Sequence, residues 1–195
     1  MRNFTWHELI NYLCGLLKLI KIRIHFSIGC QVRVFDPLVH VPEKIKKNTR
    51  ISVDAMAIGK AKANKNIKNV NGTKVEVPVL TLHEAMSKYN EENHEITYLK
   101  LDIDGAEFSV LNQLVESGML EQVQQLNVAM NTGTQHIPTK RQILPKLNHI
   151  LKIFQKMQES LGFYLIASNM DGCKAKKYCI KRIYHTYHDL LFYKG

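Results

Sequence analysis

The sequence is poor in cysteine. Its four cysteines, Cys14, Cys30, Cys173 and Cys179, are too few for a disulfide scaffold. Cys173 and Cys179 are close enough in sequence to pair across a loop if the chain meets an oxidising compartment. The sequence has no CxxC motif and no second close pair of cysteines, so it does not favour a zinc site. No metal centre is predicted.

The N-terminal segment lacks an uncharged apolar run long enough to span a bilayer, which takes roughly 20 residues. Its longest uncharged run covers only residues 9–17. Apolar residues recur there at helical spacing, which predicts an amphipathic helical segment over residues 1–24 that lies on the domain. An interfacial helix in contact with a membrane is the alternative interpretation. A cytoplasmic location is favoured, and a secretory or membrane-associated one stays open.

Acidic residues are also scarce. Asp and Glu number 17 against 27 Lys and Arg, so the formal net charge is +10 in a chain of 195 residues. This excess favours anionic partners such as nucleic acid, an acidic lipid surface, or a phosphorylated or sulfated substrate. The basic clusters at residues 44–50 and 174–182 lack interleaved aromatic side chains on a clear stacking surface and match no nucleic-acid motif. Three functional interpretations are considered: an enzyme, a non-catalytic binding module and a nucleic-acid-binding domain. The nucleic-acid-binding domain is therefore the least favoured of the three.

Strand-like and helix-like patterns alternate along the chain, which has the apolar content of one globular domain. This order predicts an α/β fold whose sheet is mostly parallel and is closed by a C-terminal antiparallel hairpin. Thr81 and Glu84 are spaced as a helix-capping box. The polar stretch at residues 61–74 is interpreted as a solvated loop. Strands are expected at residues 50–58, 75–82, 96–103, 123–130, 163–170 and 187–195, and helices at 82–90, 106–117 and 138–162.

An acidic turn follows the strand expected at residues 96–103. It carries Asp102, Asp104 and Glu107. An EF-hand is excluded because the first and twelfth positions of such a loop would not be acidic here. A tight turn at Asp104 and a helix start at Glu107 explain two of the acids. They do not explain Asp102, which falls on the same strand face as Lys100.

Ligands of open α/β sheets bind outside the carboxyl ends of the strands. We therefore expect the acidic turn to lie at the carboxyl end of a central strand. Asp36 ends another strand-like run, so we expect it close to Asp102 or Asp104 across the same crevice. Carboxylates placed there can accept hydrogen bonds, act as a general base, or hold a cation.

Three segments together resemble a known family. The stretch YLKLDIDGAEFSVLNQL, residues 98–114, resembles the K-x-D-x-E-G-x-E signature of FkbM-type methyltransferases, with Asp104 where that family usually has Glu. Residues 30–39 resemble its second strand, which ends in an acid followed by proline, and residues 77–86 add a weaker match. The resemblance runs from about residue 30 to residue 194. Within the family, the chain is similar to animal proteins of the methyltransferase-like protein 24 type.

The resemblance implies a Rossmann-like methyltransferase domain over residues 25–195. Such a domain binds S-adenosylmethionine and transfers its methyl group, here to the oxygen of a small molecule, a glycan or a protein. Asp36 would hydrogen-bond the ribose hydroxyls of the cofactor, and Gly29 and Asp102 would complete the cofactor site. Asp102 and Asp104 would face methyl transfer as the catalytic residues.

The sequence lacks the glycine-rich loop that such a methyltransferase carries after its first strand. Gly29 is all that remains of such a loop between the strand-like runs at residues 24–28 and 31–35. Parallel neighbours need a crossover of about a dozen residues, so these runs are expected to form one bent strand or a tight antiparallel hairpin. The N-terminal part of the sheet would then be truncated or rearranged. We therefore predict weak or no binding of S-adenosylmethionine, and a non-catalytic binding module is the alternative to an enzyme.

Overall fold

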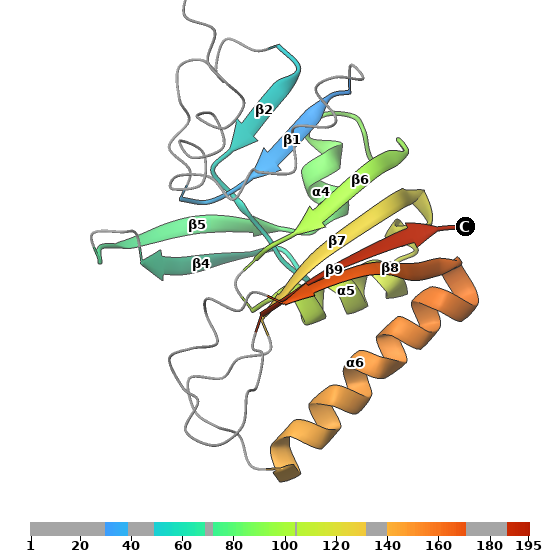
Figure 1. The fold of residues 1–195 in the computed structure, drawn as a ribbon. Helices are drawn as coiled ribbons and strands as arrows, with labels where there is room; N and C mark the ends of the chain where they lie inside the picture. The colour runs from blue at the N-terminus through green and yellow to red at the C-terminus, as the bar shows by residue number, and fades with distance from the viewer. Residues whose placement is uncertain (1–29, 39–48, 69–71, 104, 132–139, 171–186) are drawn as a thin grey trace, which may run out of the picture. The chain divides into compact units, whose positions relative to one another are not determined.

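The computed structural model in Figure 1 divides the chain into two compact units, which are Met1–Ala57 with Lys62–Val79, and Ile58–Ala61 with Leu80–Gly195. The described residues are 30–38, 49–68, 72–103, 105–131, 140–170 and 187–195. The predicted helix at residues 1–24, the strand-like run at 24–28, Cys173 and Cys179 lie outside them. Among the described residues, no helix is long and apolar enough to cross a membrane.

The first unit contains a parallel strand pair and an antiparallel one. Strands β1 (Val32–Phe35) and β2 (Ile51–Asp54) run in parallel, with Val32 opposite Ile51. Strands β4 (Ala63–Lys68) and β5 (Lys74–Leu80) are antiparallel.

The prediction of a solvated loop at residues 61–74 is therefore wrong over β4. Strand β5 buries Val77 and Val79, and β4 forms by pairing with it. Most side chains of β4 are exposed. Their polarity is typical of a loop, but pairing with a neighbouring strand overrides this local preference.

Helix α4 (Leu82–Ser87) has the capping box that the sequence predicts. The Thr81 Oγ1 atom accepts a hydrogen bond of 3.2 Å from the Glu84 backbone N–H, and the Thr81 backbone N–H donates to Glu84 Oε2 over 2.9 Å. This reciprocal pair satisfies two backbone N–H donors at the helix start. The helix lies in the second unit, as does Ile58 of the two-residue strand β3 (Ala57–Ile58).

The second unit is built on a sheet of order β6-β7-β9-β8. Its strands are β6 (Ile96–Leu101), β7 (Val123–Asn131), β8 (Phe163–Met170) and β9 (Tyr187–Lys194). Strands β6 and β7 are parallel, whereas β9 is antiparallel to both β7 and β8. The α/β class and the C-terminal antiparallel pair are thus confirmed. Together with the pairs of the first unit, the described pairings are mixed rather than mostly parallel.

Strand β6 stands at the end of this order among the described strands, so it is not the central strand that the sequence predicts. Its residues are half-buried, and Leu101 is only 2% exposed.

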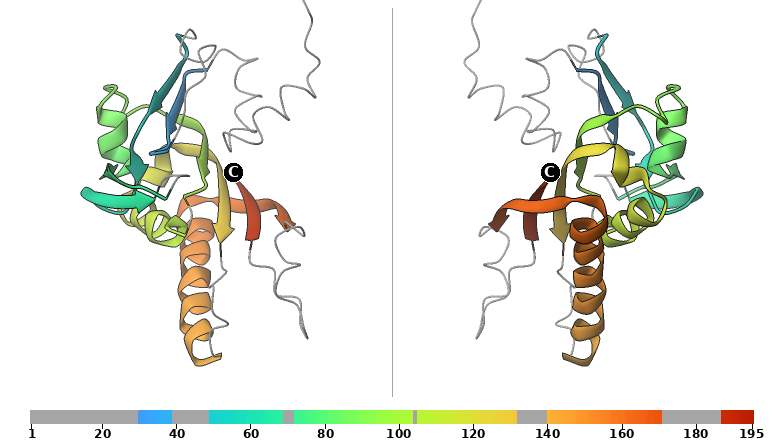
Figure 2. Two further views of the ribbon diagram at one scale, coloured as in Figure 1. Left: turned by 90° about the vertical axis from the view of Figure 1, so that its left-hand side faces the viewer. Right: turned by 90° about the vertical axis from the view of Figure 1, so that its right-hand side faces the viewer.

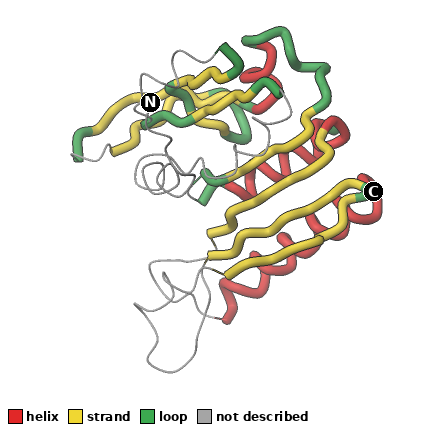
Figure 3. Tube along the Cα trace, turned by 45° about the horizontal axis from the view of Figure 1, so that its top comes forward, coloured by secondary structure: helices red, strands yellow, loops and turns green. Residues whose placement is uncertain are grey.

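Two helices cover one face of this sheet. Helix α5 (Glu107–Glu116) is followed by a short 3-10 turn (Met119–Gln122), and helix α6 (Lys140–Leu161) precedes β8. Figures 2 and 3 show α5 and α6 along the same side of the strands. The core between helices and sheet is made of buried apolar side chains, among them Val110, Leu111, Leu114, Leu126, Val128, Met157, Phe163 and Phe192.

The opposite face of the sheet has several polar side chains beside apolar ones such as Leu191, which lies opposite Asn127. Strand registers place Lys100 beside Asn127, and Tyr98 beside Gln125. They also place Gln125 beside Tyr193 and Ala129 beside Asp189. Because side chains alternate between faces along each strand, these residues share one side. We call Tyr98, Lys100, Gln125, Asn127, Asp189 and Tyr193 the polar sheet face.

Candidate functional site at the carboxyl end of β6

The site begins where β6 ends and the chain turns into α5. Leu101 is the last strand residue, and α5 begins at Glu107. Between them, Gly105 adopts a φ of +100°. This conformation is strained for any residue with a side chain. The predicted turn with Gly105 in it is therefore present, and Asp104 beside it lies outside the described residues.

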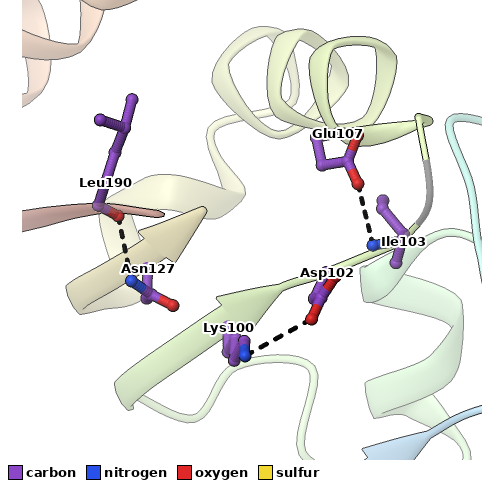
Figure 4. A network of polar contacts seen from close by, with 6 residues as sticks. All are labelled: Lys100, Asp102, Ile103, Glu107, Asn127 and Leu190. Atoms are coloured by element: carbon purple, nitrogen blue, oxygen red, sulfur yellow. Dashed lines mark hydrogen bonds and ion pairs between the residues drawn. The ribbon is translucent and has the colours of Figure 1, made fainter. Parts of the chain in front are cut away.

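Glu107 holds this turn from within. Its side chain is fully buried. Its Oε1 atom accepts hydrogen bonds from the backbone N–H groups of Ile103 and Gly105, each over 3.1 Å, and its Oε2 atom accepts from Gly105 over 2.9 Å. Figure 4 shows the carboxylate reaching back from α5 to the strand end. A buried carboxylate is tolerated because it accepts these bonds. Glu107 thus has a structural role.

Asp102 lies on the other side of the strand from α5, as Figure 4 shows. Its Oδ2 atom is 3.5 Å from the Nζ atom of Lys100, and the two side chains are 12% and 24% exposed. This ion pair explains how a carboxylate is accommodated next to an apolar strand. The pair leaves part of the Asp102 carboxylate within reach of solvent. Asp102 can therefore accept a hydrogen bond or a proton from a ligand at this strand end.

Asn127 is a polar residue of this region that sequence reasoning missed. It lies in β7 directly opposite Lys100 and is fully buried. Its Nδ2 atom donates to the Leu190 carbonyl over 3.2 Å. Its Oδ1 atom is buried and accepts no hydrogen bond from the described residues. Such an unsatisfied acceptor costs about 1–3 kcal/mol. The sequence carried little signal for it, because β7 has other amide side chains, Gln124 and Gln125.

Two ionisable groups complete the polar sheet face. Burial raises the pKa of Tyr98 to about 12, and the negative charge of Asp189 adds to this rise. The Oδ1 atom of Asp189 is itself buried and has no hydrogen-bond partner among the described residues. The face therefore holds buried oxygen acceptors on both β7 and β9, and the one on β7 lies opposite Lys100 of β6.

Asp36 follows β1 in the first unit. Its backbone N–H donates to the Asp54 carbonyl over 3.1 Å, and its Oδ1 atom accepts from the Leu38 backbone N–H over 2.9 Å. This local bond is typical of an acid that starts a turn. Asp102 belongs to the other unit, so the predicted proximity of Asp36 and Asp102 stays a prediction. Gly29 lies outside the described residues.

Across the described ranges, no three His, Cys, Asp or Glu side chains gather in a way that could hold a metal ion. Comparison with curated proteins and with solved structures found no match. Comparison with protein families found one. The description of that family is Methyltransferase FkbM domain, and it matches residues 22–164, which is well over half of the chain and includes both Asp36 and the acidic turn. The chain therefore belongs to the FkbM methyltransferase domain family.

Proposed function

We propose that this chain is an S-adenosylmethionine-dependent methyltransferase that acts on an oxygen acceptor. The observation that carries the proposal is the family match over residues 22–164. Its signature acid, Asp102, lies at the carboxyl end of β6, where ligands of α/β sheets bind. The proposal extends to a Rossmann-like domain over residues 25–195 and an N-terminal helix at residues 1–24. It also extends to kinship with the methyltransferase-like protein 24 type.

The residues proposed to hold the cofactor are Gly29, Asp36 and Asp102. Of these, the two acids have the chemistry that such a ligand needs. Asp36 uses one carboxylate oxygen in its turn, and a carboxylate has further lone pairs that can accept from ribose hydroxyls. Asp102 is partly exposed at its strand end and can accept from an amino group. When bound, the cofactor supplies an electrophilic methyl group on a sulfonium.

On the acceptor side, Asp102 and Asp104 are proposed to take the proton that the acceptor hydroxyl loses. Lys100 orients the Asp102 carboxylate through the 3.5 Å ion pair. Proton acceptance by a positioned carboxylate is ordinary general-base chemistry. The roles of Glu107 and Asp102 differ for a physical reason, because Glu107 is fully buried in backbone hydrogen bonds whereas Asp102 is not.

A second candidate is a non-catalytic module that keeps the fold. It is favoured by the short stretch between residues 24–28 and 31–35, where Gly29 alone replaces a glycine-rich loop. Without close backbone approach, the cofactor would lose contacts to its amino-acid end and ribose. Under either candidate we expect the affinity for S-adenosylmethionine to be weaker than in a methyltransferase with a complete loop.

The test is transfer of an isotopically labelled methyl group at millimolar cofactor, which compensates for weak binding. The acceptors offered are polyols and protein extracts. Digesting the labelled extracts with glycosidase or protease would show whether the label is on glycan or on protein. Asp102→Asn should abolish transfer. Lys100→Met breaks the same ion pair but keeps the carboxylate, so it should retain part of the rate. If the folded wild-type chain transfers no label under these conditions, the enzyme proposal fails and the non-catalytic candidate replaces it.

A further inference from the structure

Strand β4 stands at the edge of its sheet. In the order β3-β5-β4, it has β5 as its one neighbour among the described strands, and Figure 1 shows the two strands side by side. Along an antiparallel pair, every second residue directs its backbone N–H and C=O toward the partner strand, so the remaining groups of β4 point outward. The side chains of residues 62–66 are exposed. The outer edge of β4 therefore offers backbone donors and acceptors to an extended ligand.

The charge of this part of the first unit has one sign. We call residues 62–79 the basic ribbon, because they contain four lysines and a single acid, Glu76. The lysines are Lys62, Lys65, Lys68 and Lys74. The register sets Lys65 opposite Val77 and Lys68 opposite Lys74, so no acid faces a lysine across the pair. Like charges directly opposite each other destabilise a strand pair. The stability of the ribbon therefore does not explain its lysines.

The lysines of β4 and its start fall on both faces of the basic ribbon. Lys65 shares a face with Val77, which stands opposite it. Lys62 and Lys68 are each three residues away from Lys65, so by the alternation of side chains they fall on the other face. A flat anionic surface, such as a membrane, lies against one face only. A ligand reaches the cations of both faces at once only along the outer edge of β4, where the unpaired backbone groups are.

An extended acidic peptide has the chemistry that this edge recognises. Added as a strand, it pairs its backbone with β4 and directs alternate side chains to the two faces, where carboxylates meet the lysines. We infer that β4 binds an acidic segment of a partner protein by strand addition. A second copy of this chain is a poor occupant, because β4 against β4 would set lysines against lysines. Single-stranded nucleic acid is also a poor occupant, because residues 62–79 contain no aromatic side chain on which bases could stack.

The test is a titration of the nitrogen-labelled full chain with three capped peptides, followed by NMR. The acidic probe, TEVEEVEVT, has glutamates on both faces of an extended strand. The second probe has glutamine in place of every glutamate. The third keeps the acidic sequence but has alternate backbone amides N-methylated, which blocks strand pairing and preserves the charge. The acidic probe should bind at least about ten-fold more tightly than either control and should slow hydrogen exchange at every second amide of β4.

Two double variants locate the binding. Lys62→Gln with Lys65→Gln removes one cation from each face of the edge, so the acidic probe should bind about ten-fold more weakly. Lys152→Gln with Lys156→Gln is the matched control, because it changes the net charge equally but lies on α6 of the second unit. It should bind the probe like the wild type. All four side chains are exposed, so both variants should fold.

Equal affinity for the acidic and glutamine probes would overturn strand addition by an acidic segment. Equal affinity for the N-methylated probe would overturn it too, since charge attraction would then act without backbone pairing. Vesicles containing phosphatidylserine are the last arm. If they bind the wild type but not the Lys62 and Lys65 double variant, while the acidic probe binds neither, the ribbon contacts a membrane surface and the inference is wrong. A failure of the proposed function looks different, because it abolishes methyl transfer and leaves peptide binding unchanged.

Discussion

Glu107 supports the strand-to-helix turn from a fully buried position, and replacing it should destabilise the whole second unit. In Glu107→Leu, the backbone N–H groups of Ile103 and Gly105 lose their acceptor. Each buried donor left unsatisfied costs about 1–3 kcal/mol. Because Gly105 is exposed, water can take over part of its bond, so we expect a total loss of about 2–4 kcal/mol. That is a large part of the free energy of unfolding of an ordinary domain.

Urea unfolding followed by circular dichroism measures this loss. Glu107→Gln should have an intermediate effect, since one oxygen remains but an amide group then faces the Gly105 N–H. Glu116→Gln is the matched control at the exposed far end of α5, where the carboxylate accepts only from the Asn112 side chain in the described contacts. It should change the free energy of unfolding by less than about 0.5 kcal/mol. If Glu107→Leu and Glu116→Gln proved equally stable, a structural role for Glu107 would be refuted.

Three further predictions follow from the same region. Gly105→Ala should lower the free energy of unfolding by about 1–2 kcal/mol because its φ is +100°, although no atom would contact the new Cβ within 4 Å; a thermal melt as stable as the wild type would contradict this. Leu101→Asp should abolish cooperative unfolding, since Leu101 is 2% exposed and an unpaired buried charge costs several kcal/mol; a soluble variant that melts like the wild type would argue against that burial. The pKa of Tyr98 is raised from 10.0 to about 12, so the folded state keeps its proton where the unfolded state has lost it. Stability should therefore fall as the pH rises from 10 to 12, and Tyr98→Phe should make this fall shallower in pH-dependent unfolding.

Local sequence signals were sufficient for most elements of the second unit. The capping box at Thr81, the apolar runs of β6 and β7, and the glycine after α5 each specify structure within a few residues. Their periodicity and caps are local, so they can be read without the fold. Strand β4 could not be read in this way, because its polar residues become a strand only through pairing with β5.

The candidate site was predictable in part. The position of Asp102 followed from strand periodicity. Its ion pair with Lys100 and the structural role of Glu107 are seen only in the three-dimensional structure. Asn127 was missed because its significance lies in a register across strands, opposite Lys100, and in one unsatisfied oxygen. Pairings between segments that are distant in the chain produce no characteristic residue spacing in the sequence.

Our central proposal is that this member of the FkbM family keeps the acceptor side of the site while its cofactor side is incomplete. Asp36 can offer hydrogen bonds worth about 1.5–3 kcal/mol each when charged, whereas micromolar binding requires about −8 kcal/mol. Isothermal titration with S-adenosylmethionine tests this most directly, with Asp36→Ala as the companion variant. The account predicts a dissociation constant well above the micromolar range for the wild type. A dissociation constant in the low micromolar range that is lost in Asp36→Ala would contradict it.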